Sequence, residues 1–152
     1  MKPVGRRVAR SAVVAAIAAA LAGCLSGCAS AITDVRIENS MRTSFSNLYT
    51  LQQHQRGLPV DAVRLNTVAS CDRGSAAQAR GPGDDWVCNV TWRTETATTG
   101  AAVYSLNVHP DGCYSADGDG PVDLNGSATL VDLDGRTVLN PLWAFDGCFP
   151  LS

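Results

Sequence analysis

The sequence predicts an α+β fold, in which an N-terminal helix packs on an antiparallel β-sheet of about five strands and two disulfides link the strands. A change in the spacing of apolar residues along the chain predicts this fold. Apolar residues recur at helical spacing between residues 33 and 57, and from residue 63 onward they alternate with polar residues. Four cysteines follow the helix, an even number that permits two bridges.

Residues 33–57 are predicted to form the single helix. Thr33 and Asp34 are alternative N-caps, Gly57 ends the pattern, and Pro59 prevents the helix from resuming. A stripe of Met and aromatic residues is far more often packing than a ligand site, so we assign it to the core. The predicted core face comprises Ile37, Met41, Phe45, Leu48 and Gln52, widened by Tyr49 and Leu51.

Three segments after the helix alternate apolar with polar residues, the pattern of strands with one buried face. They span residues 63–71, 86–93 and 104–109, and the second carries Trp86 and Trp92 on its apolar face.

The C-terminal part contains two further predicted elements. The stretch TLVDLDGRTVL is typical of a hairpin, with Asp134 and Gly135 as a type I′ turn. The stretch NPLW is predicted to begin a short terminal helix, because Asn140 is a good N-cap and Pro141 suits the first helical position.

The four cysteines after the helix are predicted to pair as Cys71–Cys88 and Cys113–Cys148, one of three possible connectivities. Cys71 and Cys88 fall on the inward faces of successive predicted strands, within bonding reach. Cys113 and Cys148 each follow an Asp-Gly pair, in DGCY and DGCF. A zinc site is the alternative. It is disfavoured because no CxxC spacing occurs and the chain is expected to be exported to an oxidising compartment.

Residues 1–23 have the layout of a lipoprotein signal peptide. Four basic residues precede the uncharged run SAVVAAIAAALAG, which is shorter than the ~20 apolar residues of a membrane span. The run ends in LAGC, followed at once by LSGC, and both resemble the bacterial lipobox, whose Cys thiol receives a diacylglycerol. The alternatives are a signal peptide without lipid and an uncleaved N-terminal anchor.

The two lipoboxes give two candidate lipidation sites, Cys24 and Cys28. Cleavage before Cys24 leaves an apolar segment of about a dozen residues, the usual length in such leaders. Cleavage before Cys28 leaves no odd thiol beside the four paired cysteines. We place the lipid on Cys24, because the peptidase reads the local segment, and keep Cys28 as the alternative. Residues 24–32 are then a lipidated tether and residues 33–152 a single domain.

The chain after the leader is acidic. The whole chain has a net charge of −2, and cleavage of the leader would remove four bases and no acid. Beyond Arg93 the only base is Arg136, against eight acids. This balance disfavours binding to nucleic acid, which requires a basic surface.

Four stretches, SCDRG, GPGDDWVCNVTW, YSLNVHPDGCYSADGDGP and NPLWAFDGC, resemble an uncharacterised family of small secreted lipoproteins of high-GC Gram-positive bacteria. The resemblance covers nearly the whole chain after the leader. It implies an envelope location and supplies no catalytic residue.

No catalytic residue, metal ligand or cofactor site is predicted. His109, Asp111 and Ser115 lack the nucleophile elbow and oxyanion loop of a serine hydrolase, and the other histidine is His54, on the helix. The stretch DGDG begins like a calcium loop, but Pro121 occupies a ligand position.

We therefore expect a non-enzymatic binding or accessory module, anchored by lipid at the extracytoplasmic face of the cell membrane. Its expected partner is an envelope protein or a wall component. The alternatives are an inhibitor of an extracellular enzyme and a small extracytoplasmic enzyme. Trp86 and Trp92 give a first test, because buried rings belong to the core and exposed rings mark an interface.

Overall fold

The computed structural model describes residues 32–58, 60–74, 79–94, 96 and 98–151. The predicted leader and both candidate lipidation sites, Cys24 and Cys28, lie outside the described residues. The described elements are, in chain order, α2 (Asp34–Gln55), the 3-10 helix η1 (Ala62–Leu65), β1 (Val68–Asp72), β2 (Gly83–Arg93), β3 (Thr99–Val108), β4 (Cys113–Gly120), β5 (Thr129–Val131), β6 (Thr137–Leu139) and β7 (Ala144–Cys148).

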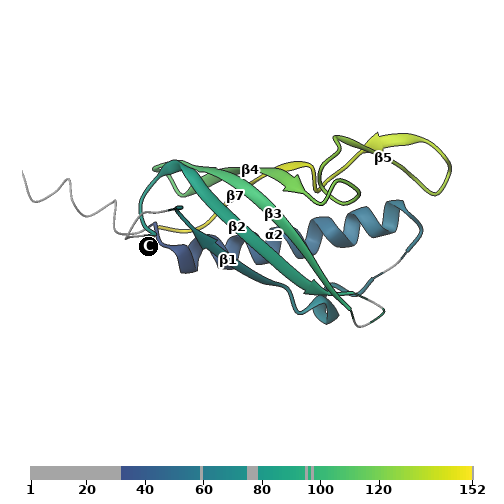
Figure 1. Ribbon diagram of the computed structural model, residues 1–152, viewed down its shortest axis with the longest axis horizontal. Helices are drawn as coiled ribbons and strands as arrows, with labels where there is room; N and C mark the ends of the chain where they lie inside the picture. Colours follow the sequence, from purple (N-terminus) through teal and green to yellow (C-terminus); the bar gives the residue numbers. More distant parts are fainter. Residues whose placement is uncertain (1–31, 59, 75–78, 95, 97, 152) are drawn as a thin grey trace, which may run out of the picture.

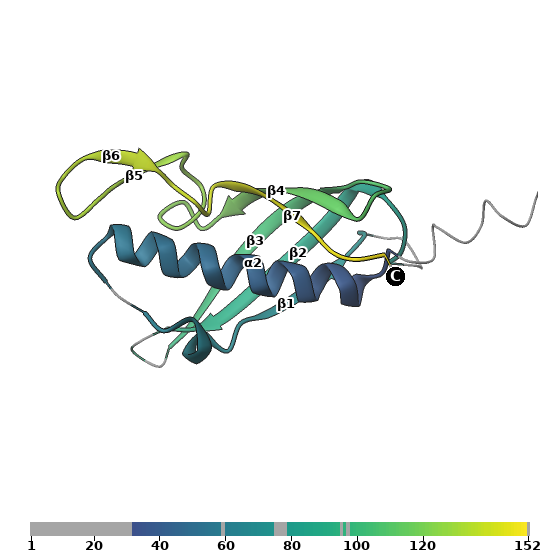
Figure 2. The same ribbon diagram turned by 180° about the vertical axis from the view of Figure 1, so that it is seen from behind.

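Five strands form one antiparallel sheet in the order β1-β2-β3-β4-β7, and α2 packs on one face of it (Figure 1). The predicted α+β fold with five strands is therefore confirmed. The start of α2 and the C-terminus lie at one end of the molecule, and the β5–β6 hairpin lies at the other (Figures 1 and 2).

The membership of the sheet differs from the prediction. The hairpin at residues 129–139 forms, but β5 and β6 make a separate two-stranded sheet, and β4 and β7 complete the main sheet instead. Tyr114 and Ala116 of β4 are buried, whereas Asp117 and Asp119 face solvent. The DGDG stretch is therefore the end of a strand and not the start of a loop.

The helix α2 begins and ends close to the predicted positions. The hydroxyl of Thr33 accepts the backbone N–H of Arg36 at 3.4 Å, and Gly57 adopts a φ of 73° just beyond the C-cap. The prediction that Leu51 belongs to the core face is wrong, since this side chain is 48% exposed. Leu51 lies about 200° around the helix from Tyr49, which is buried.

The first strand is shorter than predicted and begins at Val68. The residues before it form η1, because Asp61 caps this turn by accepting the backbone N–H of Val63 at 2.9 Å. Asn66 ends η1 in the left-handed conformation, with a φ of 45°. As a result Val63 is 85% exposed instead of facing the core.

Both predicted disulfides form. Cys71 and Cys88 are register partners on β1 and β2, with Cα atoms 4.1 Å apart. Cys113 and Cys148 are register partners on β4 and β7, with Cα atoms 4.0 Å apart. The first bridge is buried in the core, whereas Cys148 of the second is exposed. Two structural disulfides are typical of an extracellular protein.

A mild thiol reductant is expected to open Cys113–Cys148 before Cys71–Cys88 in the folded protein. Exchange requires a thiolate to reach a sulfur atom, and Cys148 is the exposed member of the four bridged cysteines. Alkylation after brief reduction, followed by peptide mass mapping, measures which pair is labelled. Equal labelling of both pairs at all times contradicts the expectation. The urea-unfolded protein, in which burial protects neither pair, is the control.

The turn of the β5–β6 hairpin is not of type I′. Gly135 has a φ of 75°, whereas Asp134 is not among the residues with positive φ, and a type I′ turn requires both. The N–H of Gly135 donates to the carbonyl of Asp132, and the N–H of Asp132 donates to the carbonyl of Arg136. The loop is therefore one residue longer and places a left-handed glycine after a tight turn.

The predicted terminal helix at NPLW is also wrong. Asn140 caps a turn and not a helix, because its Oδ1 accepts the N–H of Leu142 at 3.1 Å and the chain then enters β7. The same oxygen accepts Nε2 of Gln52 at 2.8 Å, and this nitrogen also donates to the carbonyl of Leu124 at 2.8 Å. This buried polar network joins the hairpin segment to the end of α2 and fixes its position.

Candidate functional site

The outer side of α2 is the candidate functional surface. Between Glu38 and His54 its only charged residue is Arg42, and most of the other residues that are not buried are Ser, Thr or Asn. Within the described part of the chain, no helix or strand lies over this side (Figure 2). Two grooves run along its flanks, and Thr43 lines both of them.

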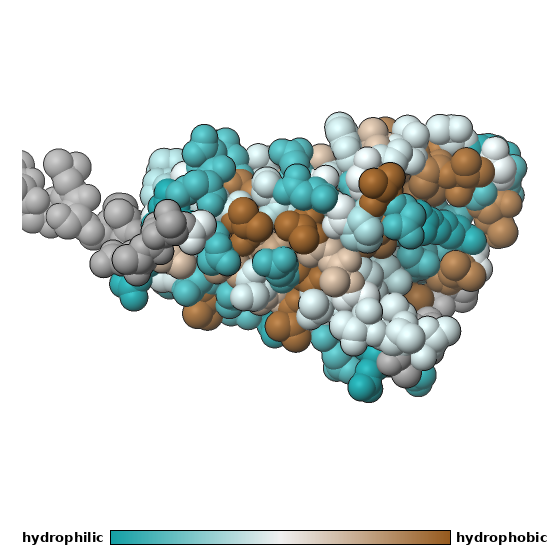
Figure 3. Space-filling model, viewed as in Figure 1, coloured by the Kyte–Doolittle hydropathy of each residue, from teal (hydrophilic) through white to brown (hydrophobic). Residues whose placement is uncertain are grey.

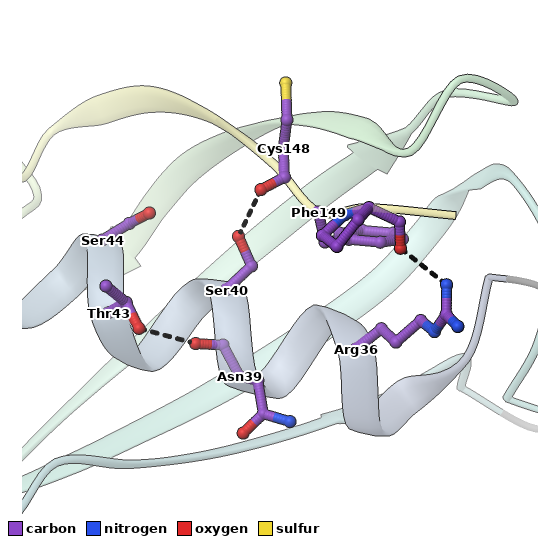
Figure 4. A pocket seen from close by; sticks show the side chains of 8 residues that line it. Arg36, Asn39, Ser40, Thr43, Ser44, Cys148 and Phe149 are labelled. Atoms are coloured by element: carbon purple, nitrogen blue, oxygen red, sulfur yellow. Dashed lines mark hydrogen bonds between the residues drawn. The ribbon is translucent and has the colours of Figure 1, made fainter. Parts of the chain in front are cut away.

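The first groove, here called the C-terminal groove, lies between α2 and the chain from the last residue of β7 onward, and it has a volume of about 480 Å³ (Figure 4). The hydroxyl of Ser40 donates to the carbonyl of Cys148 at 3.2 Å, and Arg36 Nη1 donates to the carbonyl of Pro150 at 2.6 Å. These bonds attach the chain end to the helix. The groove is lined by Arg36, Asn39, Ser40, Thr43, Ser44, Cys148, Phe149 and Pro150.

The second groove, here called the β1 groove, lies on the opposite flank of α2 and has a volume of about 550 Å³. One wall is the polar helix surface. The other wall is η1 and the start of β1, where Val63 and Val68 are exposed. The hydroxyl of Ser46 donates to that of Thr67 at 2.8 Å and closes the floor between the two walls. The groove is lined by Arg42, Thr43, Ser46, Asn47, Ala62, Val63, Asn66, Thr67 and Val68.

The charge of the grooves is opposite to that of the chain. Among the described residues, each groove has one arginine in its lining, Arg36 or Arg42, and no Asp or Glu lines either of them. The chain as a whole carries 14 acids and 12 bases. Both grooves therefore present hydroxyl and amide groups beside a positive charge, which suits a polar ligand that is neutral or anionic.

In the described ranges, the two ionisable groups with a shifted pKa lie outside both grooves. The hydrogen bond from Arg73 lowers the pKa of Asp85, on β2. Burial raises the pKa of Tyr104, whose hydroxyl donates to the carbonyl of Leu142 at 3.2 Å. Neither group lines one of the two grooves, so neither supplies an acid or a base to a ligand bound there.

Among the described residues, no hydrogen-bonded set forms from the residues considered above for chemistry. Asp111 accepts the backbone N–H of Cys113 at 3.0 Å, and no hydrogen bond joins it to His109 among the described residues. His54 lies in the last turn of α2, on a different element. Trp86 and Trp92 are both buried, so they belong to the core. Across the described ranges there is no group of three or more potential metal ligands.

Exposed hydrophobic side chains gather at the end of the molecule that carries β5 (Figure 3). They belong to the hairpin, to the loop before it and to the chain beyond the end of α2. The backbone N–H of Leu133 donates to the carbonyl of Gln55 at 2.7 Å, which holds the hairpin loop against the helix. The exposed set at this end is Leu58, Val122, Val131, Leu133 and Leu139.

The grooves could not be assigned from the sequence pattern, because each forms only where two separate segments of the chain pack together. The sequence does contain one indication that the outer side of α2 is a binding surface. The outer side of α2 has a run of Ser, Thr and Asn with a single charge, and a solvated helix face usually carries more charged residues.

No family model, curated protein or solved structure matches this chain. No helix in the described part is long and apolar enough to cross a membrane. The fold and the grooves together define a small disulfide-linked α+β domain with a polar, grooved helix face.

Proposed function

We propose that the protein is a non-enzymatic binding module, anchored by lipid at the extracytoplasmic face of the cell membrane. The observation that carries this proposal is the pair of grooves along α2, which offer hydroxyl, amide and guanidinium groups to a ligand. The two disulfides support it, because such bridges persist in oxidising compartments. The paired lipoboxes support the anchor, with Cys24 as the acylated residue and Cys28 as the alternative.

The anchor is tested by the intact mass of the protein extracted from membranes, before and after reduction. A chain that begins at Cys24, carries a diacylglyceryl mass and gains two protons per disulfide is the expected result. A lipidated chain that begins at Cys28 moves the site without removing the anchor. A chain without lipid contradicts the proposal.

The binding surface is tested by crosslinking in the cell. A photoreactive amino acid replaces Thr43, which lines both grooves, and in the control it replaces Asn107, which is exposed on β3. We expect a wall or envelope component to be crosslinked from position 43 and not from position 107. Capture of the same bulk lipids and proteins from both positions contradicts a binding role for the helix face.

The exposed hydrophobic end favours a second candidate, an inhibitor of an extracellular enzyme. The hairpin is exposed and is held by the network of Gln52 and Asn140, and a segment that enters an enzyme cleft benefits from such preorganisation. The test incubates the protein with extracellular proteases and glycosidases, and Leu133→Asp is the matched variant. Inhibition that this variant loses supports the candidate, and equal inhibition by both forms contradicts it.

A further inference from the structure

We propose that the β1 groove binds an anionic glycan, a polysaccharide whose sugar units carry carboxylate or phosphate groups. This inference rests on the proposed binding function and names the ligand class. It is carried by three properties of the groove: walls of unlike polarity, side-chain amides without a hydrogen bond to any described residue, and a guanidinium group without an ion pair among the described residues.

The two walls of the β1 groove match the two kinds of surface on a sugar ring. Val63 and Val68 present exposed methyl groups on one side, where the C–H face of a sugar can pack. Thr43 and Asn47 of α2 present a hydroxyl and an amide on the other side, where sugar hydroxyls find donors and acceptors. A small number of polar groups beside an apolar wall is the usual composition of a ligand site.

Two amides in the groove are available to a ligand. Asn47 and Asn66 are both exposed, and no side-chain hydrogen bond engages either amide within the described residues. Each primary amide offers donors and an acceptor together, the combination that a sugar hydroxyl uses. Asn66 is the C-cap of η1 and adopts the left-handed conformation, with a φ of 45°.

The charge of the groove favours an anion. Arg42 lines the groove, and no ion pair or hydrogen bond with another described residue engages its guanidinium group. The acid nearest in sequence to this wall is Asp61, which precedes η1. Its carboxylate pairs with Arg64 at 3.6 Å and accepts the N–H of Val63, so it does not pair with Arg42. A free guanidinium group binds carboxylate and phosphate oxygens by paired hydrogen bonds.

The test measures the affinity of the full chain, kept in detergent, by isothermal titration calorimetry with four defined polymers. Polygalacturonate carries carboxylates on sugars, phosphomannan carries phosphates on sugars, dextran is a neutral glycan, and polyglutamate carries carboxylates without sugars. We expect binding to one or both anionic glycans and weaker binding to dextran and polyglutamate. Which anionic glycan binds more tightly decides between a carboxylate and a phosphate ligand.

Three variants locate the binding. Arg42→Gln is expected to weaken binding of the preferred glycan about tenfold, through the loss of a charge-assisted hydrogen bond. Val63→Asp adds an acid to an exposed wall and is expected to weaken it as well, without disturbing the core. Arg136→Gln is the matched control. It removes an exposed arginine that pairs with Asp134 on the β5–β6 hairpin and does not line the groove, so affinity should stay within about twofold.

Four results overturn this inference. They are no binding of either anionic glycan, equal binding of dextran, equal binding of polyglutamate, and equal losses in Arg42→Gln and Arg136→Gln. Circular dichroism of each variant shows whether it is folded, so a loss of binding can be separated from a loss of structure. Failure here leaves the lipid mass and the crosslinks from Thr43 as separate measurements, which decide the proposed binding function on their own.

Discussion

Replacement of Phe45 by alanine is expected to lower the free energy of unfolding by about 3–5 kcal/mol. Phe45 is fully buried, and its ring centroid lies 4.8 Å from that of Trp92 and 5.8 Å from that of Tyr49. The truncation opens a cavity where α2 meets the sheet. Since domains of this size are stable by only about 5–15 kcal/mol, the loss is a large share of the total. Urea unfolding followed by tryptophan fluorescence measures it.

The matched control for Phe45→Ala is Leu51→Ala, on the same helix. Leu51 is largely exposed, so its truncation should change the free energy of unfolding by no more than about 0.5 kcal/mol. This pair of variants also tests the corrected position of the core face, because the hydrophobic pattern alone assigns both residues to it. Equal losses in the two variants contradict the packing described above.

The strands that were predicted correctly are those in which local pattern and tertiary environment agree. On β2 the buried residues Trp86, Cys88, Val90 and Trp92 alternate strictly with less buried ones, so the period of two is visible in the sequence. The same period placed Cys71 and Cys88 on inward faces. This was sufficient to predict their disulfide, because antiparallel register partners lie directly opposite each other.

The strands that were missed have residues of low intrinsic strand preference. The second half of β4 is Asp-Gly-Asp-Gly, and β7 contains Asp146 and Gly147. A Cβ at Gly147 would collide with the ring of Tyr114, so glycine is needed there for packing across the strands. Such a requirement comes from the neighbouring strand. A local pattern therefore does not reveal β7, and the sequence predicts instead that a short helix begins at NPLW, just before this strand.

The β1 groove shows why the site was harder to predict than the fold. Its walls come from residues 42–47 and 62–68, and the prediction that Val63 is buried on a strand would have removed one of them. The side chain of Asp61 caps η1 by accepting the N–H of Val63, and in this turn Val63 is exposed. The capped turn therefore creates an exposed apolar wall where the sequence pattern predicts a continuous strand.

Removal of the buried bridge by Cys71→Ala and Cys88→Ala is expected to destabilise the protein more than removal of the exposed bridge by Cys113→Ala and Cys148→Ala. Chain entropy alone predicts the opposite order. The bridges span sequence separations of 17 and 35 residues, for which loop closure contributes about 3 and about 4 kcal/mol respectively. Burial reverses the order, because two sulfur atoms lost from the core cost roughly 2 kcal/mol more through lost contacts and a cavity.

Both double variants should remain folded, so that their stabilities can be compared by urea unfolding. Each outer strand keeps a bond to α2 after its bridge is lost. The carboxylate of Glu38 accepts the N–H at position 71 at 3.0 Å, and the hydroxyl of Ser40 donates to the carbonyl at position 148 at 3.2 Å. Since both variants exchange two cysteines for two alanines, the comparison separates burial from loop length. If the variant without the exposed bridge is the less stable, loop closure dominates and the buried sulfur atoms contribute little to the core.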